Sequence, residues 1–308
     1  MRTVYLAITI DVEPDCSDNW VYSNPLTFTG VSVGIKNILQ PLFNKYKVAP
    51  TYLINNVVLE DKKSIETFKT LKGEFELGTH LHPEFIEPQK IFDNYAGKKG
   101  EANCCFLPPE IEKQKLHNIT QLFYQQFGYK PVSFRAGRFS AGTNTIRTLI
   151  DLEYKVDTSV TPEIIWNDKS RERIVDYSRQ TAFPYWLDMT SFPSAGRMKS
   201  LLEVPVSIAT VKKNFFKLKL SWLRPFYSSA KDMIKLSKYI IASTLDEQPV
   251  ILNMMFHNVE VMPGLSPYAK DQSAANRLVQ QIEDYLKWCS HYQIIGITLK
   301  GCYEKFKH

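Results

Sequence analysis

Three acidic side chains, Asp11, Glu13 and Asp15, stand at alternate positions where the first apolar run of the chain ends. Alternate residues of an extended segment point to the same side, so the three carboxylates are expected to gather there. Carboxylates brought together repel one another unless a cation or a bound proton neutralises part of the charge. The spacing therefore indicates a cation site or acid–base chemistry at this strand end. The alternative is a loop of solvated acids.

Three of the six histidines, His80, His82 and His257, also lie at the ends of predicted strands. Because one residue separates His80 from His82, both imidazoles face the same side of an extended segment. With one carboxylate they form a ligand set that is typical of zinc, and it also suits cobalt, nickel, manganese or iron. We therefore expect one divalent metal ion, zinc in the first place. The alternative is that both imidazoles only hydrogen-bond at the strand end.

Two further polar residues end predicted strands: Arg135 the fourth and Asp157 the fifth. In parallel α/β proteins the carboxyl ends of the strands share one face, and active sites form on that face. We therefore expect one site that combines polar groups from five strands, namely Asp11, Glu13, His80, His82, Arg135, Asp157 and His257.

The elements that must position these groups alternate between strand-like and helix-like patterns along the chain. Predicted strands begin at residue 4, cover 48–54, 75–82 and 132–135, end at 157, and cover 201–208, 249–256 and 294–299. Predicted helices cover about 33–46, 61–71, 109–127, 143–152 and 229–243, and a long final helix starts after Ser266 as its N-cap. Residues 163–200 fit loops and short strands.

Such alternation predicts parallel strands joined by right-handed crossovers. The expected fold is α/β: a distorted parallel (β/α)7–8 barrel that forms a single domain over residues 1–308. An open doubly wound sheet is the alternative. The barrel is favoured because no glycine-rich phosphate-binding turn follows the first strand.

The composition limits the class of protein and its surroundings. With 44% hydrophobic residues the chain can build a sizeable core, and its net charge of +6 without a nucleic-acid motif does not indicate a nucleic-acid partner. We find no secretory leader and no apolar run long enough to cross a membrane. The five cysteines are scattered, which fits reduced thiols. We therefore expect a cytoplasmic protein.

From Ile8 to about Tyr268 the chain resembles the polysaccharide deacetylases of carbohydrate esterase family 4, which have the nodulation-protein-type fold. The stretches that carry the resemblance, in chain order, are T-I-D-V-E, E-L-G-T-H-L-H-P, F-R-A-G-R, V-D-T-S-V-T-P, E-V-P-V and M-M-F-H-N. The resemblance implies a distorted barrel and the metal-dependent removal of an acetyl group from an N-acetylated sugar.

Carried over to this sequence, the resemblance implies a role for each strand-end residue. Asp11 corresponds to the general base and Arg135 to the arginine that orients it. His257 corresponds to the general acid, and Asp157 to the carboxylate that tunes this histidine. The implied metal ligands are Glu13, His80 and His82.

The chain departs from the family pattern at two motifs. The family has two adjacent aspartates, whereas Val12 separates Asp11 from Glu13 here, so Asp15 is an alternative carboxylate ligand. The family's histidines are four residues apart and here they are two apart, which opens a place for Glu84 or a water molecule. Two alternative functions follow: the same machinery acting on a non-sugar amide or an O-acetyl ester, and a catalytically silent glycan-binding protein.

Further residues are candidates for contact with a substrate or a membrane. Arg138, in the turn after the fourth strand, and Trp20 and Trp186, in predicted loops, are candidates to bind the sugar. Residues 212–227 interleave basic and aromatic side chains, as do protein surfaces that bind anionic membranes. This segment predicts peripheral contact with the inner membrane face, and the alternative is a solvated surface.

Overall fold

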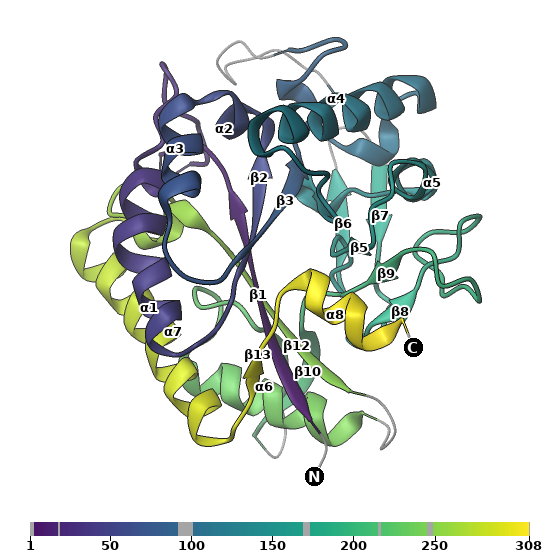
Figure 1. Cartoon of the computed structure of the whole chain (residues 1–308). Helices are drawn as coiled ribbons and strands as arrows, with labels where there is room; N and C mark the ends of the chain where they lie inside the picture. Colours follow the sequence, from purple (N-terminus) through teal and green to yellow (C-terminus); the bar gives the residue numbers. More distant parts are fainter. Residues whose placement is uncertain are drawn as a thin grey trace.

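The computed structural model describes residues 3–17, 19–91, 101–168, 173–214, 217–244 and 249–307. In this part of the chain, parallel strands follow one another in the order β12-β1-β2-β3-β4-β5-β9, and β8 extends the sheet antiparallel to β9 (Figure 1). The sheet strands are β1 (Val4–Val12), β2 (Thr51–Asn55), β3 (Glu76–Leu81), β4 (Ser133–Ala136), β5 (Val156–Asp157), β8 (Tyr185–Trp186), β9 (Leu202–Glu203), β12 (Val250–His257) and β13 (Ile295–Gly296).

The sheet curls because the chain after β9 returns to β12. The Ser207 N–H donates to the Asn253 carbonyl at 3.0 Å, and the Asn253 side-chain amide donates to the Val204 carbonyl at 3.0 Å. These bonds join the chain after β9 to β12, the strand at the opposite end of the parallel order, although the two strands do not pair as a β-ladder. The predicted distorted α/β barrel is therefore confirmed, and the open doubly wound sheet does not apply.

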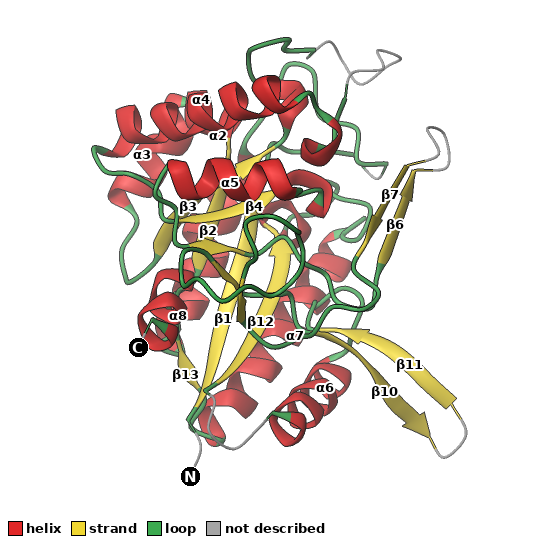
Figure 2. Ribbon diagram, turned by 90° about the vertical axis from the view of Figure 1, so that its right-hand side faces the viewer, coloured by secondary structure: helices red, strands yellow, loops and turns green. Residues whose placement is uncertain are grey.

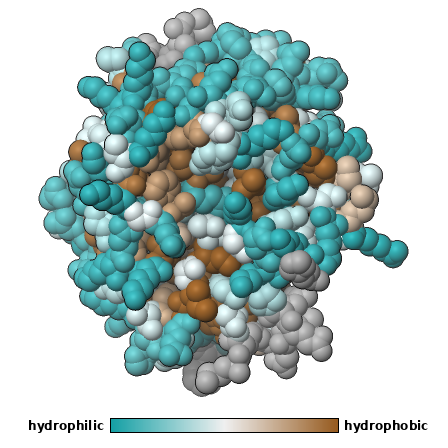
Figure 3. Space-filling view, viewed as in Figure 1, coloured by the Kyte–Doolittle hydropathy of each residue, from teal (hydrophilic) through white to brown (hydrophobic). Residues whose placement is uncertain are grey.

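Helices surround the sheet on its outer side (Figure 2). A π-helical segment, Gly30–Leu39, continues directly into α1 (Gln40–Lys45). The other helices are α2 (Asn56–Glu60), α3 (Lys62–Thr70), α4 (Pro109–Phe127), α5 (Thr143–Asp151), α6 (Ala230–Ser243), α7 (Gln272–His291) and α8 (Leu299–Phe306). Among the described residues none of these helices is long and apolar enough to span a membrane. The face shown in Figure 3 is largely hydrophilic, with hydrophobic side chains mainly toward its middle.

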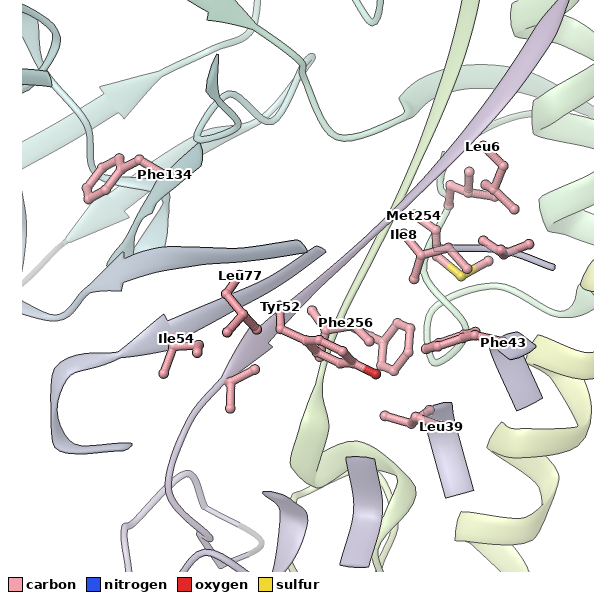
Figure 4. Close-up of a cluster of buried hydrophobic side chains, with 14 of the residues drawn as sticks. Leu6, Ile8, Leu39, Phe43, Tyr52, Ile54, Leu77, Phe134, Met254 and Phe256 are labelled. Atoms are coloured by element: carbon pink, nitrogen blue, oxygen red, sulfur yellow. The ribbon is translucent and has the colours of Figure 1, made fainter. Parts of the chain in front are cut away.

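Strand β1 lies inside the sheet and buries both of its faces. Leu6, Ile8 and Ile10 pack outward against the helices together with residues such as Phe43 (Figure 4). Ala7, which lies between Leu6 and Ile8, belongs to a second apolar cluster that contains Leu53, Val156, Leu202 and Ile251 from other strands. Because strand side chains alternate, the row that contains Ala7 continues through Thr9 to Asp11. The Asp11 side chain therefore lies on the face of β1 that points into the barrel.

Several elements differ from the sequence prediction. Helix α7, which corresponds to the predicted long final helix, begins after Asp271, whose carboxylate accepts the Ala274 N–H. Ser266 accepts backbone N–H groups of a turn that precedes this helix. The strand predicted over 201–208 is limited to β9, because the following residues enter a separate hairpin of β10 (Ile208–Asn214) and β11 (Lys217–Trp222). Residues 163–200 contain a second hairpin, β6 (Ile165–Asp168) and β7 (Arg173–Asp176). Helices α2 and α8 were not expected.

The basic and aromatic segment 212–227 contributes residues 212–214 and 217–222 to the β10–β11 hairpin, which projects from the barrel (Figure 2). Leu218 is 70% exposed on this hairpin, and Phe226 beyond it is 40% exposed. The side chains of residues 213–217 lie outside the described part of the structure. Contact of this segment with an anionic membrane therefore stays a prediction.

Candidate active site

Asp11 is held by Arg135, a buried arginine that reaches it from β4. The Arg135 Nη1 donates to Asp11 Oδ1 at 2.6 Å. The guanidinium is fixed by two other bonds, from Nε to the Thr158 carbonyl at 2.9 Å and from Nη2 to Thr9 Oγ1 at 2.7 Å. A bond from a charged donor to a carboxylate is stronger than a neutral one. The position of the Asp11 carboxylate is therefore fixed by Arg135, which is itself held by Thr9 and Thr158.

The electrostatic surroundings keep Asp11 ionised. Burial alone would raise the pKa of the carboxyl group, but the positive charge of Arg135, followed by those of His80 and His257, lowers it below its ordinary value. A buried carboxylate that stays charged near neutral pH can accept a proton.

Glu13 brings both histidines of β3 together. Its Oε1 lies 3.1 Å from His80 Nε2 and 2.9 Å from His82 Nε2, and the two nitrogens are 3.1 Å apart. All three side chains are buried. The other carboxylate oxygen of Glu13 accepts the Tyr22 hydroxyl proton at 2.6 Å. One carboxylate oxygen and two imidazole nitrogens thus converge on a single point.

The hydrogen bonds behind the imidazoles suit a metal ion at that point. His80 Nδ1 lies 3.0 Å from the Arg135 carbonyl oxygen, which can only accept, so Nδ1 donates there and Nε2 is the nitrogen that a metal ion would bind. His82 Nδ1 lies 3.5 Å from Glu84 Oε1. Metal-binding histidines commonly donate their second N–H in this way. The ligand atoms of Glu13, His80 and His82 lie within 4.8 Å of one another, and these residues fit a divalent cation.

The negative charge at this cluster favours any cation at the imidazole nitrogens. Burial alone would raise the pKa of Glu13, but His82 and His80 hold it well below its ordinary range. For His82, burial alone would lower the pKa, and Glu13 together with Glu84 raises it to about 9. A proton or a metal ion is thus stabilised at the same place.

Asp15, the alternative carboxylate ligand, has a different task. Its two oxygens accept the backbone N–H groups of Thr29 at 2.7 Å and Gly30 at 2.8 Å, at the start of the π-helical segment. It is not among the grouped metal-ligating residues that the structure describes. Glu13 therefore lies with the histidines, whereas Asp15 fixes the loop that follows β1.

His257, at the end of β12, lies close to both Asp11 and Glu13. Its Nε2 is 3.9 Å from Asp11 Oδ2 and 3.9 Å from Glu13 Oε1. Its Nδ1 is 2.7 Å from Glu260 Oε1, and the Trp20 ring packs on the imidazole with centroids 4.9 Å apart. The imidazole thus has one nitrogen bound to a carboxylate and the other turned toward the cluster.

Glu260 was not identified from the sequence. It is fully buried and accepts a bond from Arg224 Nη2 at 2.5 Å. Burial alone would raise its pKa, but Arg224 and His257 lower it, so Glu260 is ionised. It follows β12 in a short 3-10 turn (Asn258–Val261), where the strand period no longer applies. The only sequence indication is an acid three residues after a strand-end histidine.

Asp157 does not contact His257 in the structure. Its carboxylate accepts the Ser159 hydroxyl proton at 2.7 Å and hydrogen-bonds to Glu203 on β9. Strand β5 has only two residues, so Asp157 pairs across to β9 and stays among the strands. The structure does not bring Asp157 to His257, and the carboxylate beside this histidine belongs to Glu260.

A cavity of about 810 Å³ adjoins these groups. Asp11, the three histidines, Trp20 and Arg138 line it, as expected for groups that bind a substrate. Trp186, the other predicted sugar contact, does not line it. Its ring packs edge-on against Tyr303 of α8, with centroids 5.9 Å apart. The structure does not bring Trp186 to this cavity, because β8 places the indole against α8.

Comparison with solved structures shows which proteins share this fold. A protein from Mycobacterium smegmatis assigned to the polysaccharide deacetylases is similar over 99% of this chain and 91% of its own, with a TM-score of 0.57 and 16% identity. One from Pseudomonas aeruginosa with the same assignment covers 99% and 91%, with a TM-score of 0.57 and 13% identity. An allantoinase covers 99% and 90%, with a TM-score of 0.59 and 13% identity.

At these identities the likeness shows the fold alone, and the chain has the fold of the polysaccharide deacetylases. No family model and no curated protein matches the sequence. The assignment of an activity must therefore be argued from the site.

Proposed function

We propose that the protein is a metal-dependent hydrolase that removes an acetyl group from an N-acetylated sugar in a glycan or glycan precursor. The observation that carries this proposal is that Asp11 and His257 both lie beside the Glu13–His80–His82 cluster. Asp11 Oδ2 is 3.8 Å from His80 Nε2, and His257 Nε2 is 3.9 Å from Glu13 Oε1. A protein that only binds a glycan does not require a fixed base, a fixed acid and a cluster of metal-ligating groups together.

Glu13, His80 and His82 would hold one divalent ion, zinc in the first place. When bound, such an ion supplies a Lewis acid that polarises the amide carbonyl and lowers the pKa of a water molecule. The roles of the surrounding side chains follow from their own contacts.

Asp11 accepts the proton of the attacking water. Arg135 occupies Asp11 Oδ1, so Oδ2 is the oxygen turned toward His80 and His257. An amide is a weak electrophile, and removal of the water proton as attack begins makes the nucleophile stronger. Arg135 both positions the carboxylate and keeps it ionised for this step.

His257 donates a proton to the nitrogen of the departing amino sugar. Its Nδ1 lies 2.7 Å from Glu260 Oε1 and 3.2 Å from Arg224 Nη2, and these two groups fix the orientation of the ring. The proton for the leaving group is carried on Nε2, the nitrogen that faces the cluster. Glu260, itself held by Arg224, takes the place beside His257 that the sequence predicted for Asp157. The products are acetate and a free amine.

The likeness to the two polysaccharide deacetylases supports the reaction class. The likeness to an allantoinase favours a second candidate, in which the same machinery hydrolyses a non-sugar amide. The site chemistry is common to both candidates, and only the substrate separates them.

A substrate panel tests the proposal. Metal-loaded protein is incubated with N-acetylated sugars, their oligomers, O-acetylated sugars and simple acetamides, and acetate release is measured. The proposal expects release from at least one N-acetylated sugar, a much lower rate with Asp11→Asn, and normal release with Arg277→Gln on the exposed side of α7. Release from acetamides alone would favour the second candidate, and no release from any N-acetylated sugar would contradict the proposal.

A further inference from the structure

The β6–β7 hairpin forms one wall of the cavity. Trp166 and its register partner Val175 line the cavity together with Arg173. The alternate residues Ile165 and Ile174 are 52% and 56% exposed. Trp166, Val175 and Arg173 therefore line the cavity, whereas the side chains of Ile165 and Ile174 are exposed to solvent.

Arg173 on this hairpin and Arg138 in the turn after β4 contact the same short segment of chain. Arg138 Nη1 donates to the Ala102 carbonyl at 2.9 Å, and Arg173 forms an ion pair with the adjacent Glu101. Both arginines line the cavity. Because their anchors are consecutive residues, the two guanidinium groups are held on one side of it.

The carboxylates that pair with these arginines lie behind them. The side chains of Arg138 and Arg173 are 34% and 41% exposed, whereas Glu84 and Glu101 are only 9% and 14% exposed. Glu84 and Glu101 do not line the cavity. The carboxylates that do, Asp11 and Glu13, are bound to Arg135 and to the two histidines. This wall therefore offers positive charge to a bound molecule.

A guanidinium carries five N–H donors, so one that pairs with a carboxylate can also bind a second anion. The aromatic neighbours add flat surfaces for a sugar ring. Arg173 lies over the Phe106 ring at 4.9 Å, and Trp166 stacks on Phe139 with centroids 5.6 Å apart. Positive charge and flat apolar surface thus occur side by side on this wall.

We propose that Arg138 and Arg173 form an anion subsite, and that the substrate is an acidic sugar that carries a carboxylate or a phosphate beside its N-acyl group. The reaction part of this statement rests on the proposed function, whereas the anion subsite does not.

Binding of matched probes tests the subsite. Isothermal titration calorimetry compares N-acetylglucosamine 1-phosphate with N-acetylglucosamine, and glucuronate with glucose, so phosphate and carboxylate are examined separately. At least one acidic probe should bind about tenfold or more tightly than its neutral partner, since hydrogen bonds to charged groups are the strong ones. Arg173→Gln should remove most of this preference, Arg173→Lys should keep part of it, and Arg277→Gln should leave it unchanged.

Two results would overturn the proposal. One is equal binding of acidic and neutral probes. The other is a preference that survives in Arg173→Gln and disappears when the metal is removed by a chelator, which would place the anion at the Glu13–His80–His82 cluster.

The proposed function and the subsite fail separately. Equal acetate release from neutral and acidic sugars would reject the acidic substrate and keep the deacetylase. Arg173-dependent binding of acidic probes without acetate release from any compound would keep the subsite and reject the deacetylase.

Discussion

Two pairs of buried carboxyl groups at the ends of the barrel strands have opposite electrostatic states. Asp11 and Glu13 lie among Arg135 and three histidines, and both pKa values are lowered despite burial. Asp157 and Glu203 lie on neighbouring strands with mainly neutral hydrogen-bond partners. Burial raises the pKa of each carboxyl group, and the charge of Asp157 raises the pKa of Glu203 further.

The comparison shows that burial and residue type alone do not identify a catalytic acid. The first pair can accept a proton or a metal ion because cationic groups keep it charged. The second pair holds a proton between its members and joins β5 to β9. Asp157 belongs to this second pair, which explains why it does not contact His257 although it lies at a strand end.

The largest expected effect is the difference between Asp11→Asn and Asp157→Asn. Loss of a general base typically lowers turnover about 10²–10⁴-fold, and Asp11→Asn should fall in this range. Asp157→Asn should change turnover less than about tenfold, because an amide oxygen can still accept the Ser159 bond. The measurement is acetate release at saturating substrate. Comparable losses in both variants would remove the distinction between the two pairs.

Glu260→Gln should have the next largest effect. An amide at this position removes the charge-assisted bond to His257 Nδ1, a loss that corresponds to about 10–100-fold in turnover. The measurement is acetate release at saturating substrate. Turnover equal to that of the native protein would contradict a role of Glu260 in holding His257.

Parts of this site could be predicted because they follow from strand geometry. Asp11, His80, Arg135 and His257 end parallel strands, and such ends meet on one face. The tasks of Asp15 and Glu260 could not be predicted in the same way. Both stand just beyond a strand, where the direction of each side chain depends on turn geometry and the period of two no longer holds.

The fold shows the same division between local pattern and tertiary context. Helix α4 and strand β12 occupy nearly their expected ranges, since long periodic segments with clear boundaries are decided locally. The strand after residue 201 is short because Ser207 bonds to Asn253 and the chain then leaves for the hairpin. Long-range pairing of this kind leaves no local pattern in the sequence.

The free energy of unfolding of Glu203→Gln tests the electrostatic state of the Asp157–Glu203 pair. The folded-state pKa of Glu203 is raised well above its ordinary value, so the stability that it contributes is present at low pH and is lost as pH rises above the unfolded-state pKa. Glutamine keeps the neutral form at every pH and can still accept the Val160 N–H. Between pH 5 and pH 8 the variant should gain about 1 kcal/mol or more relative to the native protein, since one pKa unit corresponds to about 1.4 kcal/mol.

Urea unfolding at the two pH values measures this gain. Arg277→Gln, with no carboxyl group changed, serves as the control. A constant difference between Glu203→Gln and the native protein from pH 5 to pH 8 would show that this carboxyl does not hold its proton in the folded state.

The smallest expected effect concerns the β10–β11 hairpin, which projects from the barrel (Figure 2). If residues 212–227 contact an anionic membrane, the exposed Leu218 and Leu220 should bury apolar surface there. Replacing both by serine should then lower the fraction bound to phosphatidylserine vesicles at low salt about twofold or more. Ile295→Ser, at a residue that is 50% exposed on β13, is the matched control. Equal binding by all three proteins would exclude the hairpin as the contact.

The central claim is that the Glu13–His80–His82 cluster is a metal site with a base and an acid beside it. Metal analysis of protein purified without chelator, together with the His80→Ala/His82→Ala variant, tests it most directly. We expect about one divalent ion per chain in the native protein and almost none in the variant, since structural ligands must be present to retain the ion. No stoichiometric metal after reconstitution with zinc, cobalt, nickel, manganese and iron, or equal metal in both proteins, would contradict the claim.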